Sequence, residues 1–253
     1  DLLVHGEQPV APEAEEKYLN WIRQRAEHIP LQQLTGEQGF MGLTFNVNEH
    51  VLIPRQDTEI LVEEVLKELH DGMRVLDMCT GSGCILLSLL HYSNDCEGLG
   101  VDLSAEALEV AGRNVLKVLT PEKAEHAHFL QSDLFEKVEG KFEIIVSNPP
   151  YIASAEVEKL MPEVRDHEPR MALDGTEDGL YFYRRIIEEA GKHLVSSGML
   201  FFEIGYDQGQ AVSELMRTEG YCDVQVVQDY AGLDRVVFGT YVTVQPAPFA
   251  KSR

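Results

Sequence analysis

From residue 73 onward, short apolar stretches alternate with stretches in which apolar residues recur at helical spacing. The strand-like stretches read MRVLDM, EGLGVDLS, AHFLQSD, FEIIVSN and GMLFFEIG, and the helical stretches begin at Gly83, Ala105, residue 177 and residue 208. Short buried strands connected through helices form a parallel sheet with helices on both faces. Only a few turn residues around Gly232 separate the last two strands, so these should pair antiparallel. The sequence therefore predicts an α/β fold.

A smaller unit precedes this alternating region. Residues 12–29 place Tyr18, Leu19 and Ile22 at helical intervals and are followed by Pro30. Residues 39–54 alternate like a short β-hairpin. The predicted division of the chain is an N-terminal helical docking unit at 1–35, which we expect to be truncated, a hairpin linker at 36–55, the main domain at 56–243 and a tail at 244–253.

The charge and cysteine content narrow the class of protein. The chain has 21 Lys and Arg against 43 Asp and Glu, a formal charge of −22, which disfavours binding to nucleic-acid phosphates or anionic membranes. Its longest apolar run, CILLSLL, is too short to span a bilayer. The four cysteines form no C-x-x-C pair. We therefore expect a cytoplasmic monomer, with an organelle matrix as the alternative location, that binds no metal, nucleic acid or membrane.

Three strand ends carry the pattern of a nucleoside site. The segment VLDMCTGSGC ends a strand at Asp77 and reaches a helix through a glycine turn, where backbone N–H groups can approach a ligand. Such a turn can also serve only as a connection. Asp102 ends the next strand at the distance at which an acid accepts the ribose hydroxyls. Asp133 and Leu134 follow the third strand and could frame an adenine. The glycine spacing is not G-x-G-x-x-G, so NAD is disfavoured.

The fourth strand ends in Asn-Pro-Pro-Tyr, residues Asn148, Pro149, Pro150 and Tyr151. Pro149 moves Asn148 out of helical geometry and has no N–H of its own. The Asn148 side-chain carbonyl and the Pro149 backbone carbonyl can accept hydrogen bonds, and the Tyr151 ring offers a flat face. This rigid corner suits a planar –NH₂ group whose nitrogen is to be aimed at an electrophile. We predict these four residues as catalytic and substrate-binding.

The order of these motifs resembles class I methyltransferases that use S-adenosylmethionine. The resemblance implies a Rossmann-like, mostly parallel seven-stranded sheet with an antiparallel last strand. It also implies that Asp77 and the glycine turn hold the methionine part of the cofactor and that Asp102 holds the ribose. Cys79 stands where a glycine is usual and is expected to crowd the turn. The predicted cofactor-binding residues are Asp77, Cys79, Thr80, Gly81, Ser82, Gly83, Asp102, Asp133, Leu134 and Asn148.

Asn-Pro-Pro-Tyr is shared by methyltransferases acting on adenine N6, guanine N2 and glutamine N5, so further context is needed. Residues 51–63, 167–187 and 201–212 resemble the HemK/PrmC family of release factor glutamine methyltransferases. The resemblance implies methylation of the glutamine in the Gly-Gly-Gln motif of peptide chain release factors. Gln56 replaces a usual proline, which is expected to loosen that turn. A ribosomal-protein glutamine, an adenine N6 in nucleic acid, and a non-catalytic methyltransferase-like module remain the alternatives.

Overall fold

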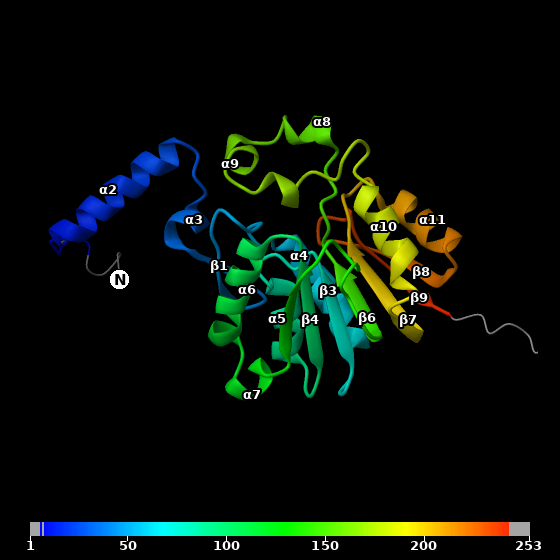
Figure 1. Cartoon of the computed structure of the whole chain (residues 1–253). Coiled ribbons are helices and arrows are strands. Elements are labelled where there is room, and N and C mark those ends of the chain that lie inside the picture. Colours follow the sequence, from blue (N-terminus) through cyan, green and yellow to red (C-terminus); the bar gives the residue numbers. More distant parts are fainter. Residues whose placement is uncertain (1–5, 7, 243–253) are drawn as a thin grey trace, which may run out of the picture.

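A computed structural model of the chain describes residue 6 and residues 8–242. Helices and strands form a layered body, and one N-terminal helix projects from it (Figure 1). The predicted tail at 244–253 lies outside the described residues, and so do residues 1–5 of the predicted N-terminal unit. The division into four segments remains a prediction.

A seven-stranded sheet forms the centre of the body, in the order β5-β4-β3-β6-β7-β9-β8. Neighbouring strands from β5 to β7 pair in parallel, whereas β9 pairs antiparallel with both β7 and β8. The strands are β3 (Arg74–Met78), β4 (Glu97–Asp102), β5 (Ala127–Gln131), β6 (Phe142–Ser147), β7 (Leu194–Glu203), β8 (Tyr221–Gln228) and β9 (Asp234–Tyr241). This arrangement confirms the predicted fold class, including the antiparallel end of the sheet.

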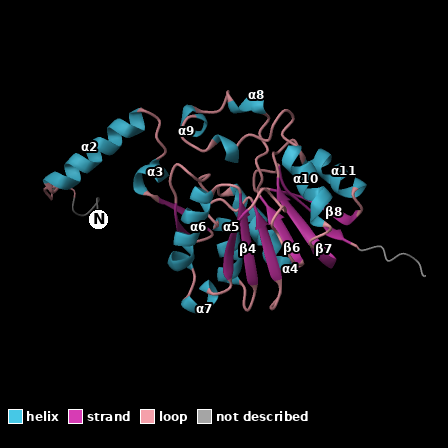
Figure 2. Cartoon of the chain, viewed as in Figure 1, coloured by secondary structure: helices cyan, strands magenta, loops and turns pink. Residues whose placement is uncertain are grey.

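Helices cover both faces of the sheet (Figure 2). Side chains alternate along each strand, so Ile144 and Val146 pack into one hydrophobic cluster and Ile145 packs into the other. The first cluster includes α4 (Asp57–Glu68), α5 (Cys84–Tyr92) and the end of α6 (Ala105–Val118), and the second includes α10 (Tyr181–Ala190) and α11 (Gly209–Thr218). Because both faces of the central strands are buried, the strands read as continuous apolar runs. The short helix α7 (Pro121–Ala124) leads into β5.

The N-terminal region consists of α2 (Pro12–Ala26), α3 (Leu31–Thr35) and the hairpin of β1 (Glu37–Phe40) and β2 (Leu43–Asn46). The predicted first helix is therefore shorter than 12–29, and none of its residues is buried. The hairpin, in contrast, is attached to the main domain. Its Phe40 and Phe45 lie in the first hydrophobic cluster, and the Asn46 N–H donates to the Asn114 side chain on α6 over 2.7 Å.

Between β6 and α10 the chain forms a cap, residues 151–180, above the carboxyl ends of the strands (Figure 1). The cap contains α8 (Ser154–Val157), α9 (Pro162–Arg165) and a short 3₁₀ turn, η1 (Arg170–Ala172). Its buried Glu168 accepts hydrogen bonds from the Ile53 N–H at 3.0 Å and from the Arg55 guanidinium. This carboxylate therefore ties the cap to the segment that follows the hairpin.

The backbone at Gln56 already has dihedral angles that proline can adopt. This residue precedes α4 with φ −63° and ψ −32°, and its N–H has no backbone acceptor among the described residues. We expect Gln56→Pro to raise the free energy of unfolding by about 0.4–1 kcal/mol, because it restricts the unfolded chain. Urea denaturation measures the change. Glu63→Pro, inside α4, serves as the control and should lower the same quantity by about 3 kcal/mol. A less stable Gln56→Pro protein would contradict the assignment of this turn.

Candidate active site

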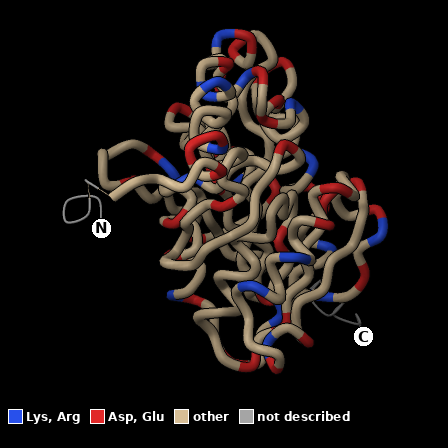
Figure 3. Tube along the Cα trace, turned by 90° about the vertical axis from the view of Figure 1, so that its left-hand side faces the viewer, with Lys and Arg blue, Asp and Glu red and all other residues tan. Residues whose placement is uncertain are grey.

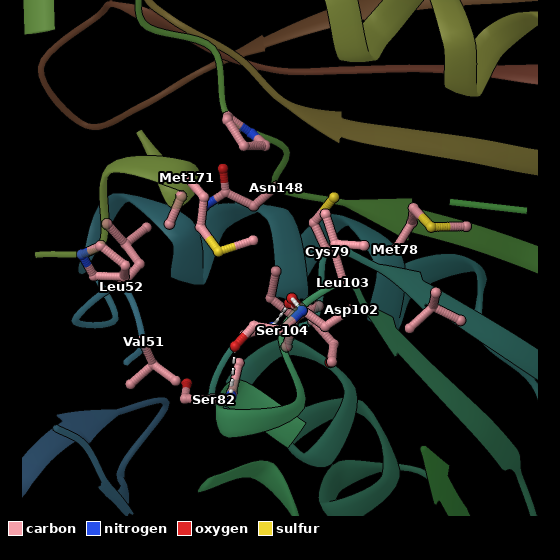
Figure 4. Close-up of a pocket in the computed structure, with 18 of the residues that line it drawn as sticks. Val51, Leu52, Met78, Cys79, Ser82, Asp102, Leu103, Ser104, Asn148 and Met171 are labelled. Carbon is pink, nitrogen blue, oxygen red and sulfur yellow. Dashed lines mark hydrogen bonds between the residues drawn. The ribbon is translucent and has the colours of Figure 1, made fainter. Parts of the chain in front are cut away.

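An open cavity lies at the carboxyl ends of the parallel strands, with about 1170 Å³ of space that is partly continuous with solvent. It lies where the strand order reverses between β3 and β6, the usual ligand position in open α/β sheets. Figure 4 shows Asn148 and Met171 on one side of this space and Asp102 and Ser104 on the other. Several parts of the chain line it: the turn after β3, the ends of β4 and β5, the tetrapeptide after β6, residues 50–58, the cap, and Phe182 of α10.

The turn after β3 adopts left-handed backbone conformations. Cys79, Gly81 and Gly83 have φ values of 64°, 55° and 77°. A Cβ atom is disfavoured there, which explains why glycine is usual at the position of Cys79. The Cys79 side chain is half-buried and lines the cavity, and its crowding of the turn remains a prediction. Burial and the nearby Asp102 raise the pKa of its thiol, so this side chain is neutral.

Asp77 lies beneath this turn and not in the cavity. It is fully buried, and its Oδ2 accepts hydrogen bonds from the Thr80 hydroxyl at 2.6 Å and the Leu86 N–H at 3.3 Å. Its Oδ1 has no partner among the described residues. Burial raises the pKa of Asp77 from 3.8 to about 7. The arrangement makes Asp77 a support of the turn, and the role with the methionine part of the cofactor that the resemblance implied for it remains a prediction.

Asp102 faces the cavity from the end of β4. Its Oδ2 accepts the Gly81 N–H at 2.8 Å and its Oδ1 accepts the Ser104 N–H at 2.9 Å. Each carboxylate oxygen has a second lone-pair direction, so two neighbouring hydroxyl groups could donate to the pair. Burial raises the pKa of Asp102, and the backbone N–H donors oppose this shift. The Gly81 N–H of the glycine turn thus helps to orient the Asp102 carboxylate, and a ligand bound at this turn could contact the same carboxylate.

Asp133 and Leu134 also line the cavity, but Asp133 is already partnered. Its Oδ1 accepts a hydrogen bond from the Arg185 guanidinium at 2.9 Å. Arg185 lies on α10, 52 residues further along the chain, and no motif in the sequence marks it. Leu134 is buried with φ 46° and adds apolar surface to the cavity wall. The ion pair with Arg185 therefore occupies part of the acceptor capacity of Asp133, and its other oxygen accepts no hydrogen bond among the described residues.

The tetrapeptide is divided between the cavity wall and the packing behind it. Asn148 and Pro150 line the cavity, whereas Pro149 and Tyr151 do not. The Tyr151 hydroxyl points to the buried Glu203 and donates to its Oε1 over 3.3 Å. Of the other predicted residues, Thr80, Gly81 and Ser82 line the cavity and Gly83 does not. Gly83 is the N-cap of α5, and a Cβ there would lie 3.2 Å from the Ala111 Cβ.

None of the motifs includes the part of the cavity wall that comes from the segment after the hairpin and from the cap. Val51, Leu52, Pro54 and Arg55 line it from the segment after the hairpin, and Met171 lines it from the cap. The only sequence signal for these residues was the family resemblance of 51–63 and 167–187. Within residues 6 and 8–242, no group of three or more His, Cys, Asp or Glu is placed to hold a metal ion. No helix in that part of the chain is long and apolar enough to cross a membrane.

The family models and the relatives that match this chain agree with one another. Residues 55–164 match the family model described as the methyltransferase small domain, and residues 1–36 match the PrmC N-terminal domain. A release factor glutamine methyltransferase of Clostridium acetobutylicum is 42% identical over 240 residues, covering 93% of this chain and 84% of the relative. Another, of Moorella thermoacetica, is 45% identical over 238 residues, covering 92% of this chain and 83% of the relative.

The fold itself recurs in solved structures. The crystal structure of a methyltransferase from Pyrococcus furiosus matches this chain with a TM-score of 0.57 at 18% identity. The match covers 80% of this chain and 91% of that one. At this identity the likeness concerns the fold alone, and it agrees with the mostly parallel seven-stranded sheet described above.

The raised pKa of Asp77 predicts a pH dependence of stability. Between 3.8 and about 7 the folded state retains a proton that the unfolded chain has released, so this group's contribution to stability falls as pH rises. Compared with Asp77→Asn, the native protein should lose at most ~1.4 kcal/mol per pH unit across this window and show a constant difference above it. Urea denaturation at intervals through the window measures both proteins. Parallel stability curves would contradict the buried, protonated state.

Proposed function

This chain belongs to the family of release factor glutamine methyltransferases, and we propose on that premise that it methylates the side-chain amide N5 of a glutamine in a peptide chain release factor. The relatives at 42% and 45% identity carry that activity in their names, and they confirm the family resemblance found in the sequence. The observation that carries the proposal is that Asn148 and Asp102 line the same cavity. Asn148 offers an acceptor for an amide –NH₂ group, and Asp102 offers acceptors for the hydroxyl groups of a ribose.

The residues around the cavity fit S-adenosylmethionine. The free lone pairs of Asp102 suit the two ribose hydroxyls, and Leu103 and Leu134 provide apolar surface for a purine ring. At Gly81 a Cβ would meet nothing within 4 Å, so this turn leaves space for a ligand. The proposed cofactor-binding residues are Asp77, acting beneath the turn, Cys79, Thr80, Gly81, Ser82, Gly83, Asp102, Asp133, Leu134 and Asn148. No metal is part of the proposal.

When bound, this cofactor supplies an electrophilic methyl group on a sulfonium centre. The chain's part is to position the nucleophile. The Asn148 side-chain carbonyl and the Pro149 backbone carbonyl would each accept one amide N–H, and the two prolines hold these acceptors in place. An amide nitrogen is a poor nucleophile because its lone pair is delocalised, so orientation and exclusion of water are the main contributions available to the protein. No strong base is required before attack, because the nitrogen becomes acidic once methylated.

The surface charge supports a protein substrate over a nucleic acid. Lys and Arg positions lie between more numerous Asp and Glu positions along the trace (Figure 3). A net charge of −22 opposes approach to a polyanion, which weakens the adenine N6 alternative. The proposal includes a release factor whose Gly-Gly-Gln loop presents the glutamine, and a monomeric enzyme in the cytoplasm or an organelle matrix.

A methylation assay tests the proposed function directly. The chain is incubated with S-adenosylmethionine labelled in the methyl group and with a purified release factor, and labelled peptides are identified by mass spectrometry. We expect label on the glutamine of Gly-Gly-Gln and none on a factor in which that glutamine is replaced. The controls are a large-subunit ribosomal protein fraction and adenine-containing oligonucleotides. Equal labelling of the two factors, or label mainly on either control, would refute the substrate assignment.

Two substitutions separate the proposed roles at the cavity. Asn148→Ala removes an acceptor for the target amide, so kcat should fall by roughly 10²-fold while the Kd of the cofactor stays within about twofold. Asp102→Ala removes the acceptors for the ribose, so cofactor binding should weaken by roughly tenfold or more. Steady-state kinetics and calorimetry measure the two effects. Loss of cofactor binding alone in both variants would show that this division of roles is wrong.

A further inference from the structure

Tyr151 is held at both ends by side chains near the end of β7. Its hydroxyl donates to Glu203 Oε1 over 3.3 Å, and its backbone carbonyl accepts from Gln208 Nε2 over 3.0 Å. Gln208 is itself fixed, because its Oε1 accepts the Gly205 N–H at 2.9 Å. Neither Glu203 nor Gln208 lines the cavity. These two contacts therefore act on the tetrapeptide from behind.

Glycines of the cap close the remaining space around Tyr151. A Cβ on Gly179 would lie 2.3 Å from the Tyr151 carbonyl oxygen, and a Cβ on Gly175 would lie 2.8 Å from the Tyr151 Cα. The backbone of the tetrapeptide is thus packed directly against the backbone of the cap. With no side chain between them, a small change in the position of Tyr151 would be passed on to the neighbouring prolines and to Asn148.

Burial of the Glu203 carboxylate is expected to destabilise the folded state. Glu203 is 2% exposed, and its Oε2 makes no well-formed hydrogen bond among the described residues, although the Thr58 hydroxyl and the Arg235 charge partly compensate it. Burying a carboxyl group with incomplete pairing destabilises a fold, and an apolar residue of similar size would often be more stable. Burial also raises the pKa of Glu203. A group with this disadvantage, aimed at a tyrosine of the catalytic tetrapeptide, indicates a role in positioning.

We infer that Gln208 and Glu203 are positioning residues for methyl transfer: they clamp Tyr151 and thereby fix the direction in which the Asn148 and Pro149 acceptors point. The inference rests on the proposed function, because it concerns the same reaction. It assigns the segment EIGYDQ a role that does not involve contact with the cofactor or the substrate. Misplacing an acceptor by about 1 Å can reduce the rate of a positioned reaction by about 10²-fold.

Gln208→Glu tests one side of the clamp. The two side chains have the same shape, and the carboxylate can still accept the Gly205 N–H, but it cannot donate to the Tyr151 carbonyl. We expect kcat for release factor methylation to fall at least about tenfold, with KM for the cofactor within about twofold. Gln210→Glu makes the same change at an exposed residue whose amide donates to Glu214 over 2.9 Å. This control should keep kcat within about twofold.

The Glu203 side of the clamp is tested by a double-mutant cycle. Tyr151→Phe and Glu203→Leu each remove the hydroxyl–carboxylate contact, so each should lower kcat at least about fivefold and the double variant should be no slower than the worse single one. Glu203→Gln keeps an acceptor and should restore most of the lost rate. Tyr230→Phe is the matched control, because its hydroxyl also lies 3.3 Å from a carboxylate, that of Glu63, on the surface. Effects that multiply in the double variant, or a Glu203→Leu protein with native kcat, would overturn the inference.

An observation independent of activity separates this inference from the proposed function. The measurement is ¹⁹F NMR of protein labelled with 3-fluorotyrosine. The resonance of Tyr151 is identified by its absence from the spectrum of Tyr151→Phe. Gln208→Glu and Glu203→Leu should shift or broaden that resonance, and Gln210→Glu should leave it unchanged. Such changes in a protein that does not methylate release factors would refute the substrate but keep the clamp. An unchanged resonance in both clamp variants would overturn the clamp even if the protein is active.

Discussion

The parallel pairing of β3 with β6 is the constraint on which the site depends. Met78 pairs with Ser147 at the last position of the two strands, and the Ser147 hydroxyl also donates to the Met78 carbonyl over 2.6 Å. Strand order reverses at this pair, so the chains that leave the two strands diverge and leave space between them. The glycine turn begins one residue after Met78 and the tetrapeptide begins one residue after Ser147. The register of a single strand pair thus brings the two main motifs to opposite sides of one cavity.

The tetrapeptide contributes few hydrogen bonds of its own, because its two prolines lack an N–H group. Its position is therefore determined by contacts from distant parts of the chain. Gly175 and Gly179 pack on its backbone, Gln208 and Glu203 bind Tyr151, and the cap that carries these glycines is tied to Ile53 and Arg55 by Glu168. These contacts lie in the three stretches that resembled one family in sequence. The residues that carry the resemblance therefore include those that hold the tetrapeptide in position.

Periodicity and strand ends were sufficient to predict the sheet, its antiparallel edge, and the placement of Asp102 and Asn148 on a common rim. They could not predict the direction of the Asp77 side chain, because a residue at a strand end can point into the cavity or beneath the turn. The pairing of Asp133 with Arg185 joins residues 52 positions apart and depends on how α10 packs. Short elements such as α8, α9 and η1 were also missed, since four or fewer residues show no helical period. Tertiary packing determined each of these features.

The acids that line the cavity are Asp102, Asp133 and Asp174, and each is compensated. Asp102 accepts two backbone N–H groups, Asp133 is paired with Arg185, and Asp174 is paired with Arg170 and accepts the Ser154 hydroxyl. Beneath the turn, burial favours the protonated form of Asp77. On the opposite side, Asn148 provides a neutral acceptor on the cavity wall, and in the proposed reaction the Pro149 carbonyl would provide a second. Because Asp133 and Asp174 are already paired with arginines, an ammonium group moved from water to a position beside Asn148 would be poorly compensated, which is unfavourable. A planar, neutral amide has two N–H donors for two carbonyl oxygens and meets no such penalty. In the proposed reaction the corner would therefore select glutamine over lysine, although the protein as a whole is strongly acidic.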